Sequence, residues 1–169
     1  MRRGLLAGAA GTLAMDLVWF RRYRRGGGDE DFADWELATS TTGFEGAAPP
    51  ALVGKRLYEL VVRRTIPDRL AAVTTNVVHW STGLQWAVAY SLAARRRGVA
   101  TPVHGLVLGP VAWAASYALL PALGVYRPIW EYEPVVLWRD LSAHLVFGST
   151  CAAALWLLGS RGPTHEARA

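Results

Sequence analysis

Aspartate and histidine side chains stand inside apolar stretches of this chain, where ionisable groups are rare. Asp140 and His144 are four residues apart in the apolar run that begins at Pro134. On a helix, residues at this spacing share one face. Ionisable groups at membrane depth usually face a bundle interior, where they act in proton relays or ligand sites or join helices. These two residues are therefore the first candidates for chemistry.

Three further polar residues, Asp16, Asn76 and His79, lie in two other apolar runs. At 1.5 Å of rise per residue, all of these side chains lie roughly 7 to 15 Å from the end of the apolar run nearest the long first loop. His104 lies near the opposite end of its run, so we expect it to stay apart. The sequence predicts one polar cluster on three helices: Asp16, Asn76, His79, Asp140 and His144.

Several kinds of site fit this cluster. It could be a hydrogen-bonded clamp between helices, or a site that handles protons or a small solute. A metal site is a third possibility, with His79, Asp140 and His144 as the ligands. Haem ligation by His79 and His144 has no supporting motif, and no cofactor is assigned.

Motifs of the common enzyme classes are absent from the sequence. It contains no Walker loop, no G-x-S-x-G and no HExxH. Ser142 lies between Asp140 and His144, but on a helix it points about 160° away from His144. We therefore assign no catalytic residue. The first function hypothesis is a proton- or solute-handling membrane protein, the alternative is a structural or interaction subunit, and a metal-dependent membrane enzyme is a distant third.

The composition indicates a membrane protein of one domain, residues 1–169. The chain is 52% hydrophobic with eight tryptophans, and its net charge is +5. The basic residues flank the apolar runs, a placement typical of membrane borders and not of a nucleic-acid surface. Cys151 is the single cysteine, so no disulfide can form within the chain.

Four apolar runs are long enough to be membrane spans, at about residues 4–20, 70–94, 101–123 and 135–158. The first could also be a signal peptide. We favour a retained helix because Asp16 interrupts the run and no cleavage site precedes Arg21. The predicted fold is all-α, an integral membrane four-helix bundle.

The long loop at residues 21–69 carries two features. Acidic residues at positions 29–36 are interleaved with Phe32 and Trp35. We interpret this segment as a solvated face, the alternative being that Trp35 and Glu36 fold back over the mouth of the bundle. Residues 51–64 follow two prolines and form an amphipathic pattern, which predicts a helix lying at the membrane interface.

Three segments carry a resemblance to a known family: GLLAGAAGTLAMD at residues 4–16, Ala-Pro-Pro at residues 48–50 and DLSAH at residues 140–144. With them the chain resembles small bacterial integral membrane proteins of unknown function, and loosely the YagU-like inner-membrane family. The resemblance implies a multi-pass location in the bacterial cytoplasmic (inner) membrane and supplies no reaction. The expected partners are the lipid bilayer and a second copy of the chain or another membrane protein.

Overall fold

The computed structural model describes residues 1–97 and 104–160, and every regular element in this part of the chain is a helix. The long helices are α1 (Arg2–Arg25), α4 (Ala71–Arg97), α5 (Gly105–Leu119) and α6 (Pro134–Ser160). Two shorter helices, α2 (Phe32–Glu36) and α3 (Pro49–Val62), lie in the loop between α1 and α4. Turns of 3-10 helix occur at Asp68–Leu70, Leu120–Leu123 and Ile129–Glu131. The all-α prediction is confirmed.

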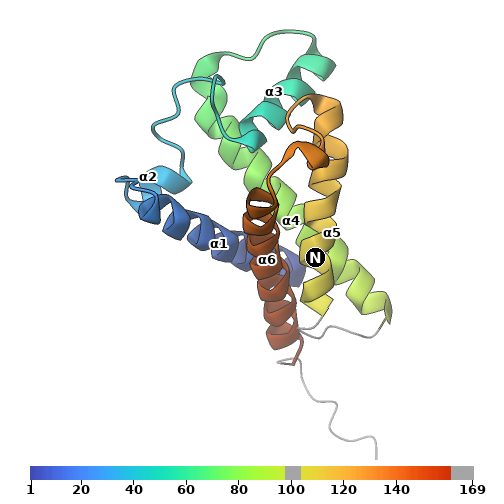
Figure 1. The fold of residues 1–169 in the computed structure, drawn as a ribbon. Coiled ribbons are helices and arrows are strands. Elements are labelled where there is room, and N and C mark those ends of the chain that lie inside the picture. The colour runs from blue at the N-terminus through green and yellow to red at the C-terminus, as the bar shows by residue number, and fades with distance from the viewer. Residues whose placement is uncertain (98–103, 161–169) are drawn as a thin grey trace, which may run out of the picture.

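Helix α1 connects the others, since it packs against both α4 and α6 (Figure 1). It runs antiparallel to α4, because Gly4 lies against Val88 whereas Asp16 reaches His79. It also runs antiparallel to α6, because the Cys151 thiol donates to the Ala7 carbonyl at 3.3 Å, whereas Arg22 at the other end bonds to the start of α6. Helix α5 packs on α6, and α3 packs on α4. Helix α1 thus contacts both α4 and α6, and α3 and α5 each pack on one of these two helices.

Small residues allow these helices to approach closely. Gly4 and Gly8 of α1 face the backbone of α4, and Gly11 faces Phe147 and Cys151 of α6. Between α5 and α6 the approach is closer still, because the backbones of Gly109 and Gly148 are in direct contact. A side chain at either position would separate the two helices.

By length and hydropathy, two of the described helical segments could cross a membrane, Gly105–Leu123 and Pro134–Gly159. The predicted spans at 4–20 and 70–94 do form long helices, α1 and α4, but these are not among the segments that meet this criterion. The physical reason is their polar content: α1 carries Asp16 and arginines, and α4 carries Thr75, Asn76 and His79. The part of the predicted third span before residue 104 lies outside the described residues.

The interpretation of the acidic segment as a solvated face is wrong for its second half. Asp29, Asp31 and Asp34 are exposed, as that interpretation expects. Helix α2, however, folds back onto the C-terminal end of α1 (Figure 1), and Trp35 packs against Phe20 with ring centroids 5.5 Å apart. The alternative stated above, in which Trp35 and Glu36 return to the bundle, is the one the structure shows.

Helix α3 agrees with the predicted amphipathic helix, and it begins at the two prolines. Its Ala51 is fully buried, and Gly54 contacts Thr74 and Val78 of α4. Further along the helix, Leu57, Leu60 and Val61 are exposed. The first half of α3 therefore packs on α4, and its second half leaves apolar side chains without protein cover in the described chain.

Candidate functional site

Asp16 and His79 form a buried pair between two helices. Asp16 lies on the packed face of α1 and is 3% exposed. Its Oδ1 lies 2.8 Å from Nε2 of His79 on α4, whose side chain is 25% exposed. The other carboxylate oxygen, Oδ2, is buried and has no hydrogen-bond partner among the described residues. The antiparallel packing of α1 and α4 over small residues is what brings the two side chains together.

Glu36, at the end of α2, lies next to this pair. Trp80 donates from Nε1 to Oε1 of Glu36 at 3.0 Å. Partial burial, and then the negative charge of Asp16, raise the pKa of Glu36 above its ordinary value. Two ionised carboxylates repel each other, and neither can donate a hydrogen bond. Glu36 can therefore form a hydrogen bond with Oδ2 of Asp16 only when one of the two carboxyls holds a proton.

Asn76 has a different role from the one expected. Its amide donates to the backbone carbonyl of Leu37 at 2.9 Å and to that of Ala72 at 2.9 Å. It therefore attaches the end of α2 to α4. The structure places it beside Glu36, one turn from His79, and not in contact with the Asp16 carboxylate.

Asp140 and His144 form a second pair, within α6. Nδ1 of His144 lies 3.0 Å from the backbone carbonyl of Asp140 and 3.2 Å from its Oδ1. Because a carbonyl only accepts, Nδ1 is the protonated nitrogen of this ring. The hydroxyl of Tyr117, on α5, lies beside the Asp140 carboxylate. Arg22 of α1 reaches the same end of α6.

The contacts of Arg22 join α1 to α6 near this second pair. Its guanidinium donates to the Arg139 carbonyl at 2.6 Å and to Oγ of Ser142 at 2.7 Å. The Ser142 hydroxyl thus accepts a hydrogen bond that joins α1 to α6. This agrees with the expectation that it forms no triad with His144.

The two pairs lie at similar levels of the bundle but are separate in the described residues. Thr12 of α1, Gly83 of α4 and Phe147 of α6 meet at one level. Because α1 is antiparallel to α4 and α6, rising residue numbers on α1 and falling residue numbers on α4 and α6 run in the same direction. About one helical turn in that direction leads to Asp16, His79 and His144. No hydrogen bond or ion pair of the described residues joins one pair to the other.

His104 directly precedes α5, where Gly105 contacts Gly148. That level is one turn beyond His144 along α6, since Gly109 contacts the His144 backbone. His104 is therefore on the far side of His144 from Asp140, as its position in the sequence suggests.

The metal hypothesis finds no matching arrangement. Within the described ranges, no group of three or more His, Cys, Asp or Glu side chains is placed to hold a metal ion. The hypothesised ligands His79, Asp140 and His144 are divided between the two pairs.

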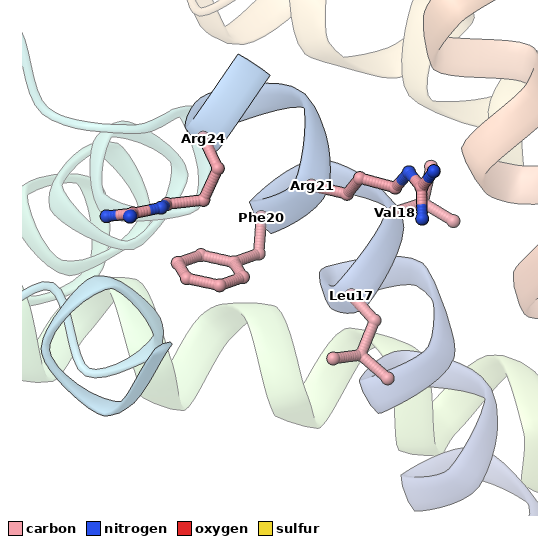
Figure 2. Close-up of a pocket in the computed structure, with 5 residues that line it drawn as sticks. All are labelled: Leu17, Val18, Phe20, Arg21 and Arg24. Carbon is pink, nitrogen blue, oxygen red and sulfur yellow. The ribbon is translucent and has the colours of Figure 1, made fainter. Parts of the chain in front are cut away.

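A shallow groove lies along the outer side of α1 and is distinct from both pairs (Figure 2). All of its lining residues come from α1: Leu17, Val18, Phe20, Arg21 and Arg24. Figure 2 shows Phe20 pointing toward α2, where it packs on Phe32 with ring centroids 5.2 Å apart. The groove contains no carboxylate or histidine, so it is not the candidate site.

A comparison of the chain with protein-family models, with curated proteins and with solved structures found no match. The resemblance to the YagU-like family therefore stays a prediction. The functional argument rests on the geometry of the two pairs.

Glu36 lies beside the Asp16–His79 pair but is not among the five residues of the predicted cluster; it is named only in the alternative for the acidic segment. The signal that could have found it is the spacing of Phe32 and Trp35, which puts two aromatic rings on one side of a short helix. An acidic segment that is solvated all round would not have an aromatic side of this kind. Asp31 supplies the helix cap, since its side chain accepts from the Asp34 amide at 2.9 Å.

Proposed function

We propose that this chain is a multi-pass membrane protein in which the Asp16–His79 pair binds and releases a proton. In this proposal α1, α4, α5 and α6 cross the bilayer, and α3 lies at its interface. The resemblance described above suggests a bacterial cytoplasmic membrane. The observation that carries the proton-binding role is the placement of a nearly inaccessible aspartate, bonded to histidine on another helix, beside a half-buried glutamate.

The distribution of side chains on α1 supports the membrane part of the proposal. Its buried face consists of Gly4, Ala7, Gly8, Gly11, Thr12 and Asp16. Its exposed face includes Leu5, Leu6, Leu13 and Leu17. A helix with small and polar residues inside and leucines outside is suited to a lipid environment, because water disfavours that surface.

The other long helices expose similar residues. The exposed apolar side chains are Val73, Val77 and Leu92 on α4, Leu106, Val107, Val111 and Leu119 on α5, and Val135, Val136, Trp138, Trp156 and Leu157 on α6. Soluble monomers seldom expose so much apolar surface. Lipid contact on every long helix accounts for it.

Spin labels should detect this lipid contact in protein reconstituted into bilayers. Labels at Val77 of α4 and Val111 of α5 should be accessible to dissolved oxygen and protected from a water-soluble nickel complex. Both positions are exposed, apolar and distant from the helix ends. A label at the exposed Asp29 is the control and should show the reverse. Strong nickel access at Val77 would mean that α4 faces water and does not span.

The chemistry of the pair follows from its donors and acceptors. With a proton on Nε2, His79 donates to Oδ1 of Asp16. The ion pair and the neutral pair, in which the proton is on the carboxyl, hold the same number of protons. Loss of one proton from either leaves a neutral imidazole beside the carboxylate. Chains of histidine and carboxylate groups are the usual elements of intramembrane proton relays, because both kinds of group can bind and release a proton.

Proton uptake by the purified protein tests the role. After an acid step in weakly buffered solution with a pH-sensitive dye, wild-type protein in bilayer discs should take up more protons per chain than His79→Gln. This variant keeps a hydrogen-bond donor but cannot take up a proton. Ser142→Ala, which removes no titratable group, is the control and should behave like the wild type. Equal proton uptake by His79→Gln and the wild type would refute the proton-binding role.

A structural clamp is the second candidate, and a specific observation favours it: the pair directly bonds α1 to α4. A clamp predicts that wild-type protein takes up no more protons per chain than His79→Gln. It also predicts that His79→Gln changes stability only slightly, since intramembrane hydrogen bonds average about 0.6 kcal/mol.

A further inference from the structure

Helix α2 is fixed in place over the end of α1 by its aromatic residues. Phe20 of α1 packs edge-on against Phe32, and Tyr23 lies with its ring centroid 6.2 Å from that of Trp35. The hydroxyl of Tyr23 also accepts from the Glu30 amide at 3.3 Å. A five-residue helix is unstable by itself, so these contacts determine where it lies.

Two side chains of α4 hold the C-terminal end of α2 beside the buried pair. Asn76 binds the Leu37 carbonyl, and Trp80 binds the Glu36 carboxylate. The two donors come before and after His79 in the sequence, so the carboxylate of Glu36 is held over the Asp16–His79 contact.

The burial of the acids decreases from the pair outward. Asp16 is almost completely buried, and its Oδ2 is unpartnered in the described chain. Glu36 is half-buried and so can reach both water and the pair. On the other side of the pair, one turn away, Thr12 is fully buried and Phe147 is 2% exposed. The pair is therefore open to its surroundings at Glu36 and at the 25% exposed side chain of His79, and closed at the level of Phe147.

We infer that Glu36 is the group through which the Asp16–His79 pair exchanges its proton with water, from the side of the membrane that carries α2 and α3. This inference rests on the proposed proton-binding role of the pair. A hydronium ion or buffer acid protonates the Glu36 carboxylate. The new O–H of Glu36 then donates its proton to Oδ2 of Asp16, and Glu36 returns to its ionised form. The pair gains one proton, shared between Asp16 and Nε2 of His79.

The charged groups around Glu36 agree with this role. Asp16 from α1 and His79 from α4 act on it in opposite directions. On its own helix, Asp31 caps the helix and Asp34 accepts from Thr39 at 3.1 Å. Burial, followed by the charge of Asp16, raises the pKa of Glu36. A relay carboxyl transfers protons best when its pKa approaches the working pH.

Proton exchange at His79 tests the inference on the whole chain. The chain has four histidines, so ¹⁵N-histidine spectra of the protein in nanodiscs are simple, and His79→Gln identifies the His79 signal. The change of this signal with pH tests the proposed function. The rate at which its N–H exchanges with water tests the role of Glu36. In Glu36→Gln we expect the His79 signal to remain and the exchange to slow by roughly tenfold or more.

Formate separates a relay from a structural role. A diffusible acid can replace a missing relay carboxyl, so added formate should restore exchange in Glu36→Gln; a packing defect would not respond. Glu45→Gln, an exposed acid of the same loop, is the matched control and should exchange like the wild type. Wild-type exchange in Glu36→Gln would overturn the inference while leaving the proposed function intact. A His79 signal that never titrates would overturn the proposed function, and the inference with it.

If Glu36→Gln does not fold, Glu36→Asp decides the question. Its carboxyl is one methylene shorter, so exchange should slow by less than in Glu36→Gln and should again respond to formate. Exchange at the wild-type rate without any response to formate would overturn the inference in this variant too.

Discussion

Replacing His79 by leucine should lower the free energy of unfolding by about 3–5 kcal/mol, because it leaves the Asp16 carboxylate buried without its partner. Asp16 is 3% exposed, and its bond to His79 is its one side-chain hydrogen bond in the described residues. In the proposed membrane location, loss of the hydrogen bond alone would cost only about 0.6 kcal/mol on average. The unpaired charge therefore dominates the effect, and unfolding in micelles titrated with a denaturing detergent measures it.

Two further variants separate charge from hydrogen bonding. His79→Gln keeps an N–H donor near Oδ1 of Asp16, so its free energy of unfolding should fall by less than about 1 kcal/mol. The double variant Asp16→Leu with His79→Leu removes both polar groups and should be close to the wild type, as replaced buried pairs often are. A loss in His79→Leu as small as that in His79→Gln would show that Asp16 is not held as a buried charge.

The helices could be predicted from the sequence because the signals that define them are local. Arginines and Gly26 end α1, Pro49 and Pro50 begin α3, and Pro134 begins α6. The similar depth of Asp16 and His79 also follows from counting residues along each helix, because the rise per residue is constant.

The separation of the two pairs could not be predicted in this way. Counting residues gives depth but not the rotation of a helix about its axis, which depends on what packs against it. In α6 the fully buried face is formed by Ala143, Phe147 and Cys151. At 100° per residue Asp140 shares this side of α6, but its carboxylate contacts His144 of the same helix and lies near Tyr117 of α5.

The position of Glu36 also depends on tertiary contacts. An acidic segment in a loop is usually solvated, and Asp29, Asp31 and Asp34 are. Glu36 differs because Trp35 beside it packs on Phe20, a residue of another helix. The spacing of Phe32 and Trp35 indicates that the segment has an aromatic side, but not which residue of another helix that side contacts.

Replacing Gly148 by leucine should separate α5 from α6 and lower the free energy of unfolding. A Cβ on Gly148 would lie against the Gly105 carbonyl and the Gly109 amide, which are backbone atoms. Backbone atoms cannot rotate away as side chains do, so the helices must move apart. Overpacking of this kind costs about 1–3 kcal/mol and occasionally more, and leucine adds three carbons beyond Cβ.

Gly159→Leu provides the control on the same helix, since a Cβ there would meet nothing within 4 Å. It should unfold like the wild type, whereas Gly148→Leu should unfold at a lower detergent fraction and lose the contact between α5 and α6. A cysteine pair placed on these two helices should then fail to crosslink in Gly148→Leu and crosslink in Gly159→Leu. Equal stability and equal crosslinking of the two variants would contradict the close approach of α5 and α6, and with it the placement of Tyr117 beside Asp140.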